Sequence, residues 1–136
     1  MMAKGVTIAA GDWISYGCLD WGPGLFHPDD AHLKEPMLAA GPVCEVAGED
    51  RQFWVLRFGP LRVRLLKELV GGGIVPKPAF VWGDQVRTKP PRTERVGRVH
   101  RIGWHASQGQ HLFWIEQNGK KLKNRYFTEE LEQVGG

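Results

Sequence analysis

Two histidines and two aspartates form the densest group of metal-ligating side chains in the sequence: His27, Asp29, Asp30 and His32. At the start of a helix this spacing could hold a metal ion, but no further His or Cys cluster completes a tetrahedral set of ligands. Aspartates in such a place also cap the first backbone amides and favour the positive end of the helix dipole. We therefore expect Asp29 or Asp30 to cap a short helix, and we expect no metal site.

Nucleophilic catalysis has little support. The sequence contains neither a Gly-rich phosphate-binding loop nor a nucleophile elbow, and neither Cys18 nor Cys44 stands at a recognisable catalytic spacing from a histidine. Two isolated, buried thiols explain these cysteines better than a disulfide does, and a cysteine nucleophile is the weaker alternative. We predict that the protein is not an enzyme and has no catalytic residue and no cofactor.

Binding is better supported, because the cationic side chains concentrate in the second half. Residues 1–75 hold 7 Lys and Arg against 9 Asp and Glu, whereas residues 76–136 hold 11 against 6. The net charge of +3 therefore combines −2 in the first half with +5 in the second. An anionic partner would be attracted to the second half.

Two segments carry this charge, a proline-stiffened loop over residues 87–95 and the stretch 120–125. If both lie on one side of the fold, they form a single basic face beside Trp104 and Trp114. Trp21 and Trp104 stand in presumed loops, where a large rigid aromatic can anchor an interface. The residues expected to contact a partner are Arg87, Lys89, Arg92, Arg95, Arg98, Arg101, Trp104, Lys120, Lys121, Lys123 and Trp21.

Five short strands between Phe80 and Val134 must position these side chains. Asn118-Gly119 between two strand-like runs predicts a tight hairpin, since a type I′ turn needs a positive φ at both central residues. The apolar residues Val99 and Ile102 bracket a change of face, which predicts a strongly bent strand. Eighteen Gly and nine Pro also favour many turns over long helices.

The first half repeats this pattern. Gly11-Asp12 echoes Gly83-Asp84, and Gly41-Pro42-Val43 echoes Gly97-Arg98-Val99. Further matches pair Phe53-Trp54-Val55 with Phe113-Trp114-Ile115, Phe58-Gly59 with Asn118-Gly119, and Glu68-Leu69 with Glu130-Leu131. Trp54 and Trp114 then share one repeat position, and some tryptophans must fill cores. We interpret the chain as two copies of one small barrel, residues 1–75 and 76–136, with unequal loops.

The first copy carries an insertion over residues 17–40. It should hold one or two helical turns from Asp29, which Pro36 ends or kinks, and a helix that forms again up to Ala40. Further on we expect a turn over residues 48–50. The Gly- and Pro-rich segment 71–78 is the best candidate for a linker between the copies.

The succession Gly83-Asp84-x-Val86-Arg87, Gly97-x-Val99, Phe113-Trp114-Ile115, Asn118-Gly119-Lys120 and Tyr126-Phe127-x-x-Glu130-Leu131 resembles SH3-like small β-barrels of the Tudor and KOW type. The chain is also similar to a family of small uncharacterised bacterial proteins that carry a His-Pro-Asp-Asp stretch, here from His27, and an Arg-Tyr-Phe, here from Arg125. The resemblance implies a mainly β protein of two tandem SH3-like barrels with a short inserted helix. Such barrels host nucleic-acid binding, peptide binding and scaffolding alike.

From these features we predict a non-enzymatic adaptor that binds another protein, as an inhibitor or immunity-type module, through the basic, Trp-bearing face of the second barrel. An RNA- or DNA-binding barrel is one alternative, because cations interleaved with aromatics suit single strands. A structural subunit of a larger assembly is the other. With no apolar run near the roughly 20 residues that span a bilayer, and no signal sequence, we expect a cytoplasmic protein without membrane contact.

Overall fold

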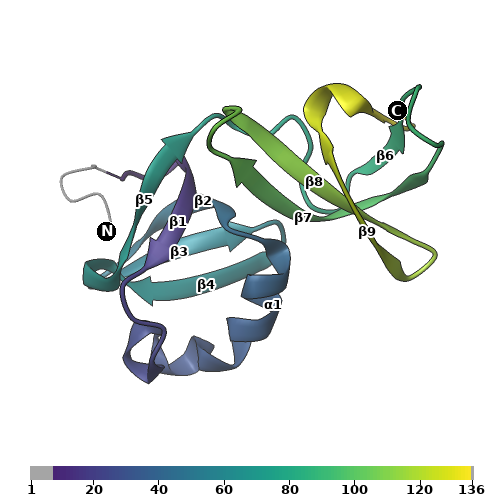
Figure 1. Ribbon diagram of the computed structural model, residues 1–136. Coiled ribbons are helices and arrows are strands. Elements are labelled where there is room, and N and C mark those ends of the chain that lie inside the picture. The colour runs from purple at the N-terminus through teal and green to yellow at the C-terminus, as the bar shows by residue number, and fades with distance from the viewer. Residues whose placement is uncertain (1–7, 136) are drawn as a thin grey trace. The chain divides into compact units, whose positions relative to one another are not determined.

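Alternation of apolar and polar side chains builds strands in both halves of the chain. The computed structural model describes residues 8–135 (Figure 1), so residues 1–7 and 136, which belong to the two predicted barrels, lie outside the described residues. The chain separates into two compact units, one up to Lys77 and one from Pro78 onward. In the described part, no helix is long and apolar enough to cross a membrane.

The first unit is an antiparallel five-stranded sheet of order β4-β3-β2-β1-β5. Its core is built by side chains with no exposed surface, among them Ile14, Leu56 and Val63. In chain order its elements are β1 (Trp13–Cys18), the 3-10 turns η1 (Pro23–Leu25) and η2 (Pro28–Leu33), α1 (Lys34–Ala40), β2 (Val43–Asp50), β3 (Phe53–Phe58), β4 (Leu61–Leu66), η3 (Lys67–Leu69) and β5 (Val70–Val75).

The second unit holds the five strands predicted for this half, which confirms that part of the sequence analysis. Its sheet is antiparallel, of order β10-β6-β7-β8-β9, over a core that includes Val86, Phe113 and Ile115. The elements are β6 (Gln85–Thr88), β7 (Val96–His105), β8 (Gln110–Gln117), β9 (Lys120–Phe127), the 3-10 turn η4 (Thr128–Glu130) and β10 (Leu131–Gln133).

The same turn opens both sheets, as the repeated Gly-Asp predicts. Gly11 and Gly83 have φ of +95° and +92°, which favours glycine. The Gly11 amide donates to the Val46 carbonyl at 2.8 Å, and the Gly83 amide donates to the Val99 carbonyl at 2.9 Å. In each turn the aspartate carboxylate accepts from the backbone amide three residues earlier, at 2.9 Å.

The other repeat matches are out of register. Val46 and Val99 accept the equivalent hydrogen bonds, so these two valines correspond to each other. Gly97 lies two residues before Val99, whereas Gly41 lies five residues before Val46, so the two glycines do not correspond. Strand β2 has a bulge between Val46 and Gly48, and β7 has one between Val99 and Arg101. The first pair after the bulge is Gly48 with Val55 in the first sheet and Arg101 with Trp114 in the second. Trp114 is therefore equivalent to Val55, one residue from the predicted match. A slip of one residue in a strand moves a side chain to the opposite face of the sheet.

Each set of five strands forms a sheet with two edges. Strand pairing in the described residues runs from β4 to β5 in the first sheet and from β10 to β9 in the second, and no pairing joins the two outer strands of either sheet. The prediction of a mainly β chain with a short helix in the first copy is confirmed. The two copies are open sheets and not closed barrels.

Several local predictions are settled as well. The Asn118-Gly119 hairpin and the irregularity in β7 between Val99 and Arg101 are confirmed. The turn over residues 48–50 is wrong, because β2 runs on to Asp50 and the loop is Arg51-Gln52. The linker over residues 71–78 is wrong at its start, because Val70–Val75 is strand β5 and pairs along β1. Glycines fit there because a Cβ on Gly72 would lie 2.2 Å from a β1 carbonyl oxygen.

Candidate functional site

The outer face of the second sheet holds the candidate site. Along β8, Phe113 and Ile115 are fully buried, so Trp114 and Glu116 between and after them point to the opposite side. Residues that pair directly across antiparallel strands share a face. The pairing of β7, β8 and β9 therefore fixes which side chains lie beside Trp114 and Glu116.

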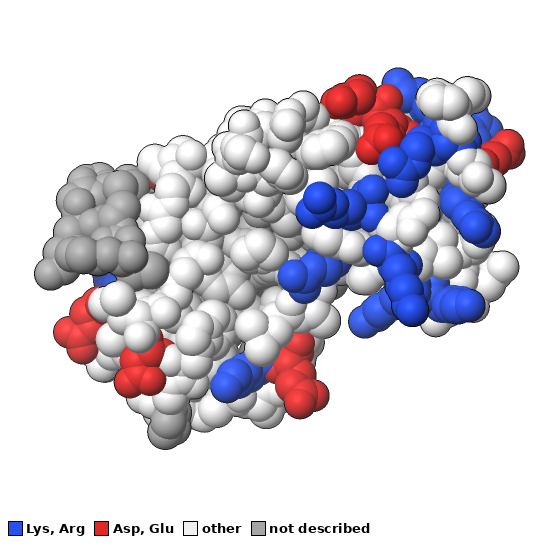
Figure 2. Space-filling model, in the orientation of Figure 1, with Lys and Arg blue, Asp and Glu red and all other residues white. Residues whose placement is uncertain are grey.

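Two rows of side chains cross these three strands. The first row is Arg98, Glu116 and Lys121, and the second is Arg101, Trp114 and Arg125. We call these six residues the basic face. Figure 2 shows Lys and Arg side chains gathered over the second unit. Four cations surround one carboxylate and one indole on this face.

Trp114 is held in a defined position on the basic face. The guanidinium carbon of Arg101 lies 5.2 Å from the centroid of the indole, a cation–π contact. The far edge of the indole reaches Gly103, where an added Cβ would lie 3.0 Å from Cζ3 and 3.2 Å from Cη2. A side chain at position 103 would crowd the ring, so the glycine lets the indole lie against β7.

Three of the cations on this face are not engaged in an ion pair among the described residues. Arg98, Lys121 and Arg125 are exposed and form no ion pair with any residue that the structure describes. Lys121 also acts on the neighbouring His100, whose pKa is lowered mainly by burial and further by the charge of Lys121. Both ring nitrogens of His100 are buried and have no hydrogen-bond partner among the described residues.

The cationic loop and the hairpin tip meet at one end of the sheet. The Gln117 side chain donates to the Val96 carbonyl at 3.1 Å, which joins the hairpin to the end of the loop. Residues at the start of β7 and at the hairpin line a shallow depression of about 300 Å³, among them Arg98, Glu116 and Asn118. Lys120 at the tip and Arg95 at the end of the loop are exposed.

Two of the expected partner-binding arginines are engaged within the unit. Arg87 pairs with Glu132 across β6 and β10 at 3.0 Å. Arg92 donates to the Glu130 carboxylate at 2.9 Å, and its guanidinium carbon lies 4.6 Å from the centroid of the Tyr126 ring. Lys89 is half-buried, and its backbone amide donates to the Glu130 carbonyl. These contacts hold the loop against η4.

Of the two tryptophans that we expected in loops at an interface, Trp104 lies in strand β7 instead, whereas Trp21 lies in the loop after β1 as expected. Trp104 is half-buried, and its ring lies 4.9 Å from that of the buried His111. Trp21 is 36% exposed, lies beside Tyr16 and belongs to the first unit. Lys123 is exposed in β9, between the residues that pair with Glu116 and with Trp114. The structure thus gathers only Arg98, Arg101 and Lys121 of the expected set around one centre.

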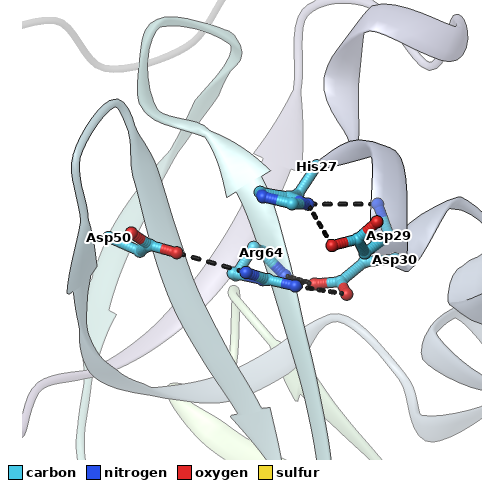
Figure 3. Close-up of polar contacts among 5 residues, drawn as sticks. All are labelled: His27, Asp29, Asp30, Asp50 and Arg64. Carbon is cyan, nitrogen blue, oxygen red and sulfur yellow. Dashed lines mark hydrogen bonds and ion pairs between the residues drawn. The ribbon is translucent and has the colours of Figure 1, made fainter.

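The histidine–aspartate group of the first unit anchors the insertion (Figure 3). His27 precedes η2, and its Nδ1 accepts a hydrogen bond from the Asp29 amide at 3.1 Å. The N-cap of this turn is therefore His27, and the prediction that Asp29 or Asp30 caps it is wrong. Asp30 turns the other way, toward Arg64 of β4. The following α1 contains Pro36 in its first turn, where proline is tolerated. Over residues 8–135 no three His, Cys, Asp or Glu are grouped to hold a metal ion.

Asp30 and Arg64 form the strongest polar contact of this group. The Arg64 guanidinium donates to both Asp30 oxygens at 3.0 Å, the Arg64 amide donates at 2.8 Å, and Asp50 accepts at 3.2 Å. Hydrogen bonds from the Arg64 side chain lower the pKa of Asp30, although burial opposes this. The group therefore fixes η2 on β4, and its charges are already paired.

Trp114 and Arg125 are absent from the contacts that we expected from the sequence. We expected Trp114 beside a basic face, but we also matched it to Trp54 in the repeat, and the register of β8 contradicts that match. Glu116 could have shown from the sequence that Trp114 faces outward. Residues two apart in a strand share a face, and a carboxylate does not face the core. Arg125 directly precedes the buried Tyr126, which places it on the outer face as well.

Comparison with known proteins gives one match. Residues 11–132 match the model of a family described as Family of unknown function (DUF6960). No curated protein and no solved structure matches the chain. Similarity therefore identifies the family and assigns no activity to it.

Proposed function

The chain belongs to the DUF6960 family, whose function is unknown, and we propose that it is a non-enzymatic binding module whose basic face binds nucleic acid. One observation carries the proposal. Arg98, Arg101, Lys121 and Arg125 surround the indole of Trp114 on one sheet face, with Glu116 as the sole acidic member of that set. Clustered cations bind phosphates and release counterions, and an aromatic ring among them can contact a base.

The distribution of apolar surface favours nucleic acid over the protein partner that we ranked first from the sequence. Protein interfaces depend on buried aromatic or apolar anchors near their centre. Among the described residues, the large hydrophobic side chains with high exposure are Leu19, Trp21, Leu38 and Ile74, all in the first unit. The surface of the second unit offers charge instead, which suits a phosphate backbone.

Fluorescence anisotropy with labelled oligonucleotides, single-stranded and duplex, tests the proposal. The association constant is measured between about 50 and 200 mM salt, since each phosphate contact contributes a slope of roughly −0.7 to −0.9 to the salt dependence. A variant with Arg98, Lys121 and Arg125 replaced by Gln should bind more weakly and reduce the magnitude of that slope by about 2–3.

A matched variant controls for net charge. Lys34, Arg51 and Arg62 are exposed residues of the first unit that form no ion pair with a described residue, and their replacement by Gln removes the same charge. This control should keep most of the affinity. An equal loss in both variants would point to general charge attraction, and no binding of either nucleic acid at low salt would overturn the proposal.

A protein partner is the second candidate, because of a different surface. Leu19 and Trp21 are 58% and 36% exposed and lie close together in the loop that follows β1. A rigid indole beside an exposed leucine is the kind of anchor on which protein interfaces depend. A protein captured from nuclease-treated lysate by the wild type, but not by a Trp21→Ser variant, would support this candidate. Capture that survives the substitution would exclude Trp21 as the anchor.

We further propose that each unit is an open variant of the SH3-like barrel. Three features support this: the strand order that both sheets share, the Gly-Asp turn before the first strand, and a 3-10 turn before the last strand. Hydrogen exchange of the backbone amides in the outer strands β4, β5, β9 and β10 would test it, because amides at an open sheet edge exchange faster than amides paired in a closed barrel.

A further inference from the structure

We infer that the basic face selects single-stranded nucleic acid over duplex, with one base stacked on Trp114. This inference rests on the proposed function and adds the ligand class. Duplex DNA presents its phosphates and buries the faces of its bases, whereas a single strand offers both. An aromatic ring at the centre of a cationic surface gains from a free base face and not from a duplex.

The position of Trp114 fits stacking. The indole lies between Arg101 and Arg125 in the pairing of the strands and reaches over Gly103. It is half-buried, so the ring is fixed before a ligand arrives and little conformational freedom is lost on binding. The planar guanidinium of Arg101 already lies over the ring, 5.2 Å from its centroid. A guanidinium in this place can also stack on a base or bind the adjoining phosphate.

A second aromatic lies one row further along the same face. Leu112 precedes Trp114 by two residues and pairs with Phe127, so Phe127 shares the outer face. Phe127 lies on β9, the strand next to that of Trp114, and such diagonal neighbours are roughly 7–8 Å apart, a spacing over which adjacent bases of an extended strand can each meet a ring. Phe127 is half-buried and its ring lies 5.8 Å from that of His105. His105 is oriented by hydrogen bonds at its Nδ1 from Ser107 and Gln108.

The cations are placed for the backbone of such a strand. Arg98 and Lys121 flank Glu116 in the row on the other side of Trp114. Glu116 forms no ion pair with a described residue, and its carboxylate repels phosphate from the middle of that row. Phosphates are therefore directed to the two ends of the row, where Arg98 and Lys121 stand, while the base reaches Trp114.

The test compares a labelled oligothymidylate of about 12 nucleotides, within the roughly 4–16 nucleotides that one OB-fold binds, with a duplex of the same length. The wild type should bind the single strand more tightly at equal salt. Trp114→Leu keeps apolar volume and removes the flat ring, so it should weaken single-strand binding by about 5- to 150-fold and weaken duplex binding by a smaller factor. Trp114→Phe should keep most of the single-strand affinity.

Trp54 provides a matched control in the first unit. It is also half-buried in a strand and also lies under a cation, with Lys67 Nζ 4.8 Å from its ring centroid. Trp54→Leu should leave both affinities unchanged. Equal affinity for single strand and duplex, or equal binding by the Leu and Phe variants of Trp114, would overturn the inference and leave the proposed function intact. Failure to bind either oligonucleotide would overturn both.

Discussion

Asp30 and Arg64 stand 34 residues apart in the chain and join through three hydrogen bonds, two from the guanidinium and one from the backbone amide. The Asp30 side chain is 11% exposed and that of Arg64 29%. This contact attaches the inserted segment to the edge strand β4. It also gives the Asp30 carboxylate a structural role.

Asp30→Asn should lower the free energy of unfolding by about 2–4 kcal/mol, because it leaves the partly buried Arg64 charge with a weaker partner. Urea unfolding measures the change. Asp29→Asn is the control, since that side chain is 79% exposed, and it should change stability by less than about 0.5 kcal/mol. The pKa of Asp30 is lowered on folding. Ionised Asp30 therefore stabilises the fold fully above the unfolded pKa of about 3.9, and this stabilisation is lost as the pH falls through the folded pKa. Similar losses in the two variants would contradict this account.

His100 should make stability depend on pH in a higher range. Its pKa is lowered by burial and then by Lys121, with Glu116 acting against and Arg101 adding to the shift. The unfolded chain therefore takes up the proton first, and stability should fall as the pH drops below about 6.5. His100→Gln should reduce this slope in unfolding measurements between about pH 5 and pH 8, whereas the exposed His32→Gln should not. An unchanged slope in the His100 variant would rule out this residue as the source.

Replacing Arg92 should destabilise the protein more than replacing Arg95 does. Arg92→Ala removes the pair with Glu130 and the contact with Tyr126, so it should lower the free energy of unfolding by about 1–2 kcal/mol. Arg95→Ala removes an exposed side chain that pairs with no described carboxylate and should change it by less than about 0.5 kcal/mol. Thermal or urea unfolding of the two variants decides. A larger effect at Arg95 would show that the loop is held differently.

Gly97 should tolerate no side chain. A Cβ there would lie 2.4 Å from the Glu116 carbonyl oxygen of the neighbouring strand, so Gly97→Ala should cost about 1–3 kcal/mol as β7 and β8 are forced apart. Gly48, also in a strand, has open space around its added Cβ. Gly48→Ala should therefore be neutral or stabilise by up to about 1 kcal/mol. The free energies of unfolding of both variants test the contrast, and equal values would refute it.

The sequence predicts strands more reliably than it predicts which face a side chain occupies. Asn118-Gly119 determines its own turn through local backbone preference, and the Gly-Asp turns are equally local. The position of Trp114 depends instead on irregular pairing on both sides of β8, with one extra residue in β7 between Val99 and Arg101 and two extra residues in β9 between Lys121 and Arg125. Matching Trp114 to Trp54 by residue type ignored this irregular pairing. Pairings of distant residues such as Arg92 with Glu130 have no signal in the local pattern.

The shared strand order also bears on how the chain reaches its native state. The Gly11 amide donates to the Val46 carbonyl, and the Gly83 amide donates to the Val99 carbonyl in the same way. A strand of one copy could therefore pair with the sheet of the other copy during folding. Neighbouring repeats of closely similar sequence are prone to such swapped assembly. The insertion and its Asp30–Arg64 contact exist in the first copy alone. Divergence of the two copies thus protects the chain against pairing with itself in the wrong order.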